Sequence, residues 1–221
     1  MTIRIGMLLF PKLTQLDLTG PYEVLARLPE VEISLLWKTL QPVRAGTGLT
    51  ILPTCTLADA PPFDVLFVPG GRGVVPLFRD QQVLEFLRNQ ARTARYVTAV
   101  CTGSLLLGAA GLLEGYEATT HWAFHELLEH GGAKPVRKRV VVDRNRITGG
   151  GVTAGIDFAL RLVAEISGEQ LARAIQLGLE YDPEPPFQSG SPELAGPELV
   201  ALVRKQMAAS RREHAEALDR Q

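Results

Sequence analysis

Cys101 stands where a thiol could act as a nucleophile. An apolar run typical of a buried strand, residues 96–100, ends at this cysteine, and a run typical of a helix follows it. Ala99 and Gly103 are the small neighbours that a tight strand-to-helix turn requires, and such a turn exposes its central side chain at the top of a sheet. Unpaired N–H groups and the dipole of the following helix would lower the pKa of the thiol. The pattern predicts a reactive cysteine, with a buried structural cysteine as the alternative.

Three further features could contribute chemistry at this turn. Asp17 follows the first apolar run, either as an acid of the site or as the acidic residue of a helix N-terminus. Gly71 ends the segment VPGG, where its N–H and that of Thr102 could form an anion hole, although such a turn can also be ordinary. His121 could be a base for the thiol, a helix-start residue or a satisfied core histidine. Its spacing from His125 is weak evidence for a metal, so we expect no metal site.

The elements that must position these residues alternate between strands and helices. Strands or strand pairs are predicted at residues 3–10, 31–38, 42–57, 63–71, 96–100, 117–122 and 136–151. A first helix is predicted to open at Gly20 and Pro21, and a second to cover residues 80–93. Further helices are predicted after Cys101 and after residue 122, two more after residue 151, and a last one at the end of the chain. Several strands are apolar throughout, which is typical of an α/β fold with a mostly parallel sheet and helices on both faces.

Ligands of such sheets bind beyond the carboxyl ends of the strands. Three turns at those ends stand out as the candidate site, at residues 11–20, 68–74 and 99–104. The first of these turns lacks a glycine-rich dinucleotide fingerprint, and the chain has no phosphate-binding P-loop, so we do not expect a nucleotide.

Composition excludes several other classes of protein. The chain has 221 residues with 23 basic and 24 acidic side chains, so we expect no nucleic-acid partner. It contains no apolar run of about 18 residues, and its first residues do not read as a signal peptide, so we expect a cytoplasmic protein without a membrane partner. The second of the two cysteines, Cys55, lies in a predicted hairpin strand and is expected to be structural. We expect one domain over residues 1–221, with a helical extension over residues 191–221.

The segments DLTGPYEV, FVPGG, VTAVCTGSLLLGAAGLLEG and ATTHW resemble the ThiJ/PfpI superfamily of class I glutamine-amidotransferase-like domains over nearly the whole chain. This resemblance implies a flavodoxin-like α/β sandwich and a homodimer that needs no cofactor. Within the superfamily the chain is most similar to the bacterial isocyanide hydratases. The features that carry this likeness are Asp17, where most relatives have glutamate, the segments CTGS and ITGGGVTAGID, the length, and the extra final helix.

The resemblance implies a reaction and a role for each site residue. Cys101 would attack the terminal carbon of a small-molecule isocyanide, and a thioimidate would form and then hydrolyse to an N-formamide. Asp17 would be the general acid and base, hydrogen-bonded to the sulfur, and Thr102 would position the acid or the substrate.

The backbone N–H groups of Gly71 and Thr102 would stabilise developing charge, and Gly150 and Val152 would lie beside Cys101. Because two negative charges in contact are costly, we expect Asp17 and Cys101 to share one proton at neutral pH.

Departures from other members of the superfamily narrow the function. Peptidase-like relatives have histidine where this chain has Thr102, and the downstream HxE arrangement of glutamine amidotransferases is absent. Transcriptional relatives share DLTGP and ATTHW but carry two helix-turn-helix units, and after Asp182 this chain has about one helix. Two alternatives stay open: a glyoxalase- or deglycase-like hydrolase, against which the shorter reach of Asp17 argues, and a non-enzymatic oxidation sensor or ligand-binding dimer using Cys101.

Overall fold

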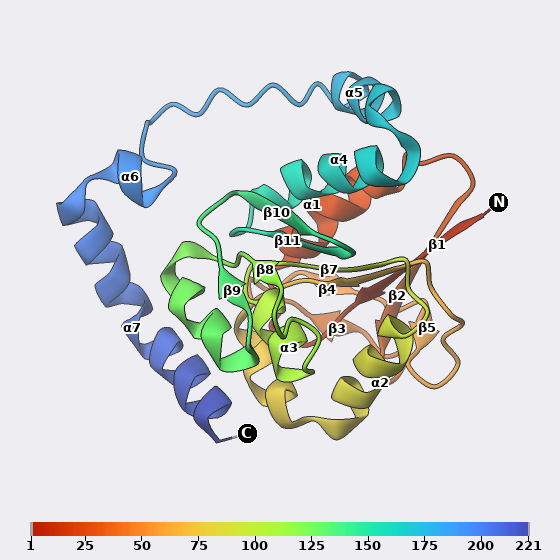
Figure 1. The fold of residues 1–221 in the computed structure, drawn as a ribbon, viewed down its shortest axis with the longest axis horizontal. Helices are drawn as coiled ribbons and strands as arrows, with labels where there is room; N and C mark the ends of the chain where they lie inside the picture. The colour runs from red at the N-terminus through yellow and green to blue at the C-terminus, as the bar shows by residue number, and fades with distance from the viewer. Residues whose placement is uncertain (1, 221) are drawn as a thin grey trace.

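A computed structural model, which describes residues 2–220, has a seven-stranded sheet at its centre, with the strand order β10-β11-β7-β6-β1-β2-β5 (Figure 1). Its strands are β1 (Ile3–Leu8), β2 (Val31–Trp37), β5 (Cys55–Thr56), β6 (Val65–Val68), β7 (Tyr96–Val100), β10 (Val140–Asp143) and β11 (Arg146–Gly149). Neighbouring strands are parallel except for the antiparallel pair β10 and β11. The predicted α/β fold with a mostly parallel sheet is confirmed.

Helices cover both faces of this sheet (Figure 1). On one face lie α1 (Gln15–Leu25), α4 (Ala154–Ser167) and α5 (Glu169–Gly178). On the other lie α2 (Gln81–Ala91), α3 (Gly103–Ala109) and the 3₁₀ segments η1 (Arg72–Arg79) and η2 (Trp122–Gly131). Two small sheets are added by the pairs β3 (Val43–Arg44) with β4 (Thr50–Ile51) and β8 (Glu117–Ala118) with β9 (Lys134–Pro135).

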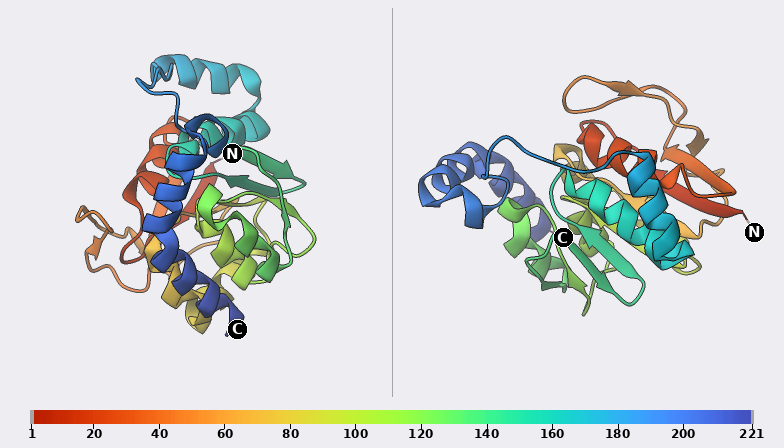
Figure 2. Two further views of the ribbon diagram at one scale, coloured as in Figure 1. Left: turned by 90° about the vertical axis from the view of Figure 1, so that its left-hand side faces the viewer. Right: turned by 90° about the horizontal axis from the view of Figure 1, so that it is seen from above.

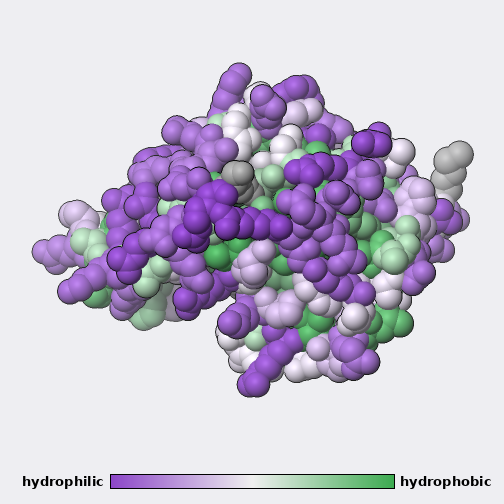
Figure 3. Space-filling view, turned by 90° about the horizontal axis from the view of Figure 1, so that it is seen from below, coloured by the Kyte–Doolittle hydropathy of each residue, from purple (hydrophilic) through white to green (hydrophobic). Residues whose placement is uncertain are grey.

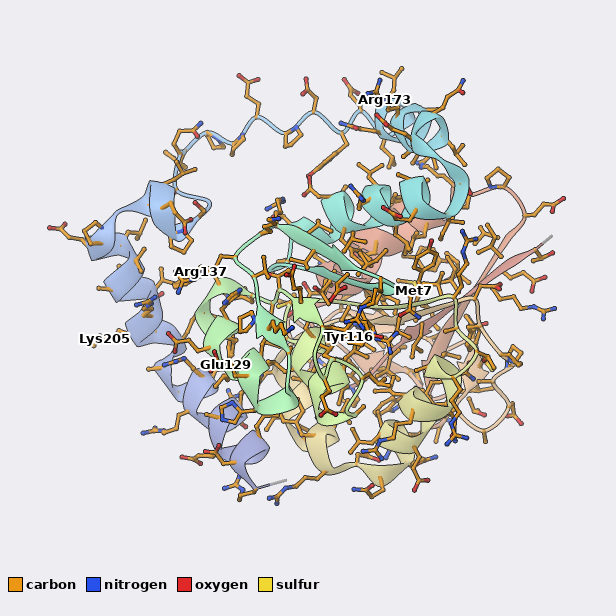
Figure 4. The ribbon with its side chains drawn as sticks, viewed as in Figure 1. Met7, Tyr116, Glu129, Arg137, Arg173 and Lys205 are labelled. Carbon is orange, nitrogen blue, oxygen red and sulfur yellow. The ribbon has the colours of Figure 1, made fainter. Side chains whose placement is uncertain are left out.

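The core runs along both faces of the central strands. Met7 of β1, which is labelled near the centre of the body in Figure 4, is fully buried, and every residue of β6 is buried. Phe67 of β6 contacts Phe158 of α4 with 5.5 Å between ring centroids, which joins the sheet to the helical layer above it. Burial on both faces is the reason why β6 is apolar throughout rather than alternating.

The carboxyl-terminal part leaves the body after α5 and returns to it as a helical arm. Residues 182–191 form an irregular connection to α6 (Pro192–Ala195) and α7 (Pro197–Asp219), and α7 lies along one end of the molecule against η1 and η2 (Figure 2). The final helix predicted after the proline-rich segment is therefore present. Over the described residues no helix is both long and apolar enough to cross a bilayer. Hydrophilic side chains predominate on the face seen in Figure 3.

Two sequence predictions about local structure are wrong. The first helix does not open at Gly20 and Pro21, because both lie inside α1, which begins at Gln15. Pro21 lacks an N–H, so it removes only one helical hydrogen bond, the one to the fourth residue before it. The ring of Pro21 packs against α4, since a Cβ built on Gly155 of that helix would lie 3.0 Å from the ring. Cys55 is not in the hairpin of β3 and β4. It lies in β5 at the edge of the main sheet, opposite Leu36.

Candidate active site

Cys101 occupies a strained turn between β7 and α3. Its φ is +55°, a left-handed conformation that residues other than glycine seldom adopt. Its N–H donates to the carbonyl oxygens of Gly149 and Gly150, at 3.1 and 2.9 Å. Its own carbonyl oxygen accepts a hydrogen bond from the Thr120 hydroxyl at 2.6 Å. Sequence reasoning missed Thr120, and these bonds hold the backbone of the predicted elbow from both sides.

Close approach of three backbone segments explains the glycines around this turn. A Cβ on Gly103 would lie 2.3 Å from the carbonyl oxygen of Val68 at the end of β6. A Cβ on Gly70 would lie 2.6 Å from the nitrogen of Thr102 and 2.7 Å from the Cβ of Cys101. The expectation of small residues at the elbow is therefore confirmed. All three predicted turns meet there, because the Thr14 N–H of the first turn donates to the Gly70 carbonyl oxygen at 2.9 Å.

The first turn of α1 brings Asp17 to the same place. Asp17 is fully buried, its Oδ2 accepts a hydrogen bond from the Gly70 N–H at 3.1 Å, and its carboxyl is hydrogen-bonded to the Cys101 thiol. It also follows Thr14 at the start of the helix, donating its own N–H to the Thr14 carbonyl at 3.0 Å. Asp17 is thus a first-turn acid by position, but its side chain contacts the candidate nucleophile and is not turned to solvent.

Burial sets the protonation of this pair. It raises the pKa of Asp17 to about 7, against which the hydrogen bonds from Cys101 and the Gly70 N–H act. Burial, and next the nearby charge of Asp17, raise the pKa of the Cys101 thiol well above its ordinary value, while the N–H groups of Thr102 and Val152 act in the opposite direction. Near neutral pH the thiol therefore retains its proton while the carboxyl titrates.

Two expectations about the thiol are therefore wrong. The side chain of Cys101 is buried, with 5% of the residue exposed, and its pKa is raised and not lowered. The physical reason is that loss of water and the adjacent carboxyl outweigh the N–H groups of Thr102 and Val152, which favour the thiolate.

Thr102 joins the elbow to the glycine turn. Its hydroxyl accepts a hydrogen bond from the Gly71 N–H at 2.9 Å and donates to the Gly71 carbonyl oxygen at 3.3 Å. Gly71 has a φ of +124°, which places its N–H on the hydroxyl. The Gly71 N–H is therefore engaged by Thr102 in this structure, and the N–H groups that donate to the sulfur are those of Thr102 and Val152.

The glycine-rich segment before α4 passes beside Cys101, as expected for Gly150 and Val152. Gly150 accepts the Cys101 N–H, and the Val152 N–H donates to the sulfur. Val152 has a φ of +31°, a strained conformation for a β-branched residue. This strained residue is also one whose N–H donates to the candidate nucleophile.

His121 has the geometry of a helix-start residue. Its Nδ1 accepts a hydrogen bond from the Ala123 N–H at 3.2 Å, and its ring stacks on Trp122 with 5.8 Å between centroids. Burial lowers its pKa to about 4, so the ring is neutral at physiological pH. Within residues 2–220 no group of three or more His, Cys, Asp or Glu side chains is arranged to hold a metal ion.

A strained cysteine elbow over a parallel sheet, with a buried acid beside the sulfur, defines a class of α/β proteins built around one buried cysteine. Residues 3–165 match the model of the DJ-1/PfpI family, and the chain belongs to this family.

Relatives of known name or structure are similar over the whole chain or most of it. The isonitrile hydratase of Pseudomonas putida is 57% identical over 220 residues, which cover 100% of this chain and 96% of that protein. A crystal structure of a ThiJ/PfpI family protein from Pseudomonas syringae superposes with a TM-score of 0.96 at 42% identity, covering 99% of this chain and 91% of the other. The HTH-type transcriptional regulator GbdR of Pseudomonas aeruginosa is 35% identical over 186 residues, which cover 80% of this chain but 50% of the regulator.

Proposed function

We propose that this chain is an enzyme that hydrates isocyanides, also called isonitriles, to N-formamides. The observation that carries the proposal is its full-length match to the P. putida isonitrile hydratase. The match to the regulator covers only 50% of that protein, so it supports no transcriptional role for this chain.

Cys101 and Asp17 supply the chemistry of the first step. With the pair carrying one proton, Asp17 takes the proton of the thiol as the sulfur forms a bond to the terminal carbon of R–N≡C. The same carboxyl then gives the proton to that carbon, so that the thioimidate R–N=CH–S–Cys101 forms. The contact between the carboxyl and the thiol supports this transfer, because one group can serve as base and then as acid without diffusion of a proton.

Water completes the reaction in the second step. It adds to the C=N carbon of the thioimidate with proton transfer to nitrogen, which gives R–NH–CH(OH)–S–Cys101. The carbon–sulfur bond then breaks, the hydroxyl loses its proton to the site, and the products are R–NH–CHO and the free thiol. Neither step changes an oxidation state or needs a cofactor.

Backbone donors would stabilise the charge that moves through the sulfur. The N–H groups of Thr102 and Val152 donate to it in the resting structure, and the Thr102 hydroxyl positions Gly71 beside the elbow. Gly150 anchors the Cys101 N–H. These contacts support the roles of Thr102, Gly71, Gly150 and Val152 as a binding shell around the thiol.

An aryl isocyanide assay tests the reaction. We expect the protein to convert the isocyanide to the N-formamide without added metal or cofactor, and Cys101→Ser to give no product. Formation of lactate from methylglyoxal with no turnover of the isocyanide would instead identify a glyoxalase. Inertness toward both substrates, together with ready oxidation of Cys101, would identify a sensor.

We also propose that the protein acts as one domain with a helical extension, as a cytoplasmic homodimer that binds no nucleic acid. Exposed apolar side chains support the dimer, since Leu177 of α5 is 83% exposed and Phe187 of the connection is 75% exposed. Light scattering on the purified protein should give twice the chain mass, and a monomer at micromolar concentration would contradict this.

A further inference from the structure

The strained conformation of Val152 needs a source of support, because a β-branched residue at φ +31° tends to relax. The helix that follows does not supply a usual cap: Thr153 occupies the N-cap position of α4, but its side chain makes no capping hydrogen bond. Its hydroxyl accepts a hydrogen bond from the guanidinium of Arg139 at 3.3 Å instead.

Arg139 contacts the segment on both sides of Val152. Its carbonyl oxygen accepts the Gly150 N–H at 2.9 Å, and its Nε donates to Asp157 in the first turn of α4 at 2.6 Å. Arg139, which directly precedes β10, thus holds the chain at Gly150, two residues before Val152, and at Thr153 and Asp157, one and five residues after it. The position can be found in Figure 4 from Arg137, which lies on the same stretch of chain.

A third side chain completes this set of contacts. The Tyr181 hydroxyl donates to the same Oδ2 of Asp157 at 3.1 Å, so the carboxylate is held from two directions. The charged and titratable groups that face the arrangement are Asp157 and Tyr181 at the guanidinium and Asp17 at the sulfur. The guanidinium remains charged at any physiological pH.

The exposure of the ion pair between Arg139 and Asp157 indicates that the role of this pair is local. The side chain of Arg139 is 52% exposed and that of Asp157 is 32% exposed. Ion pairs of this kind contribute little to global stability. They can still select one backbone conformation of a short segment when their contacts lie on both sides of it.

We propose that Arg139 is a positioning residue, which through Thr153, Asp157 and its own carbonyl oxygen holds the Val152 N–H on the Cys101 sulfur. The inference rests on the proposed function for its catalytic meaning, but its structural content concerns the sulfur alone. Without the guanidinium, Val152 relaxes toward a negative φ and its N–H turns away from the thiol.

Titration of the Cys101 thiolate tests this directly. The ultraviolet absorbance of the thiolate is followed against pH in each variant, and the same variant carrying Cys101→Ser is subtracted to remove Cys55. In Arg139→Met we expect the thiolate fraction on the rising part of the curve to fall roughly tenfold, the effect of losing one hydrogen bond to a charged group. Asp157→Asn should shift the curve in the same direction, and Arg139→Lys should restore part of the loss.

The matched control is Arg161→Met. Arg161 lies on α4, the helix that carries Asp157, and its side chain is 55% exposed. Arg161 forms an ion pair with Glu165, but this pair lies within the helix and away from Val152. We expect it to leave the titration unchanged. The proposal is overturned if folded Arg139→Met titrates like the wild type, or if Arg161→Met shifts the curve equally. Should Arg139→Met fail to fold, the near-isosteric Asp157→Asn decides by the same measurement.

Isocyanide turnover gives an independent second measurement. If the wild type hydrates the isocyanide, Arg139→Met should lower kcat with little change in KM, because the substrate contacts are kept. If the wild type has no such activity, the proposed function fails, and the thiolate titration still confirms or overturns the role of Arg139.

Discussion

At the scale of single residues, the central feature is that Asp17 and Cys101 are buried together. Burial makes the carboxyl a weaker acid, although its hydrogen bond with the thiol acts in the opposite direction. Burial and the charge of Asp17 make the thiol harder to ionise, so proton exchange between the two groups replaces a free thiolate. This arrangement suits a reaction in which the same proton leaves sulfur and reaches carbon.

The substitution Asp17→Asn should keep the fold and lower turnover by about 10²- to 10⁴-fold, the usual contribution of a general acid–base group. The amide can still accept the Gly70 N–H but cannot carry a proton. Asp17→Glu should also impair turnover, because the longer side chain misplaces the carboxyl. Formamide production measures both. Wild-type turnover in Asp17→Asn would assign the proton transfer to another group.

The pH dependence of kcat/KM should follow the ionisation of the pair. Its first proton leaves near the pKa of Asp17, about 7, and the doubly protonated pair lacks a base. Activity should therefore rise as the pH increases through about 7 and fall below it. The same profile in Asp17→Asn would show that another group is responsible.

At the scale of elements, the site depends on close packing of α3 against the end of β6. In Gly103→Ala the new Cβ would meet the carbonyl oxygen of Val68 at 2.3 Å, and backbone cannot move aside cheaply. We expect a loss of about 1–3 kcal/mol in the free energy of unfolding, measured by urea denaturation.

The matched control for that experiment is Gly178→Ala at the end of α5, where an added Cβ meets nothing within 4 Å. It should be neutral or slightly stabilising. An equal loss in both variants would contradict the packing argument.

At the scale of the whole molecule, α7 is joined to the body through a buried histidine. His214 is 1% exposed, its Nδ1 is 2.7 Å from the Ser210 carbonyl oxygen, and its ring lies 4.7 Å from that of Phe124 in η2. Burial is the main cause that lowers its pKa. The folded protein therefore binds fewer protons at this site than the unfolded chain does.

Stability should consequently fall as the pH drops below about 6.5, the ordinary value for histidine, because unfolding then takes up a proton. His214→Met places an apolar side chain of similar reach at this position. The Tm of this variant should fall less than the Tm of the wild type between about pH 7 and pH 5. Thermal unfolding at several pH values measures the difference between the two proteins. Parallel curves would show that His214 does not contribute to acid sensitivity.

The sequence alone determined the sheet and the main chemical groups. Largely apolar runs such as residues 63–71 predicted buried parallel strands, because alternation disappears when both faces are covered. The small residues around Cys101 predicted the elbow, since only a tight turn requires them. Asp17 could be proposed as the partner acid from family resemblance, although its position alone also fitted a helix cap.

Tertiary structure decided what depends on groups distant in the chain. The raised pKa of the thiol follows from burial under three segments, so the local argument from one helix dipole gave the wrong direction. Pro21 could stay inside α1 because α4 packs against its ring. The contacts of Thr120 with the elbow and of Arg139 around Val152 have no local sequence signal, because hydrogen bonds between residues far apart in the chain exist only once the fold has brought them together.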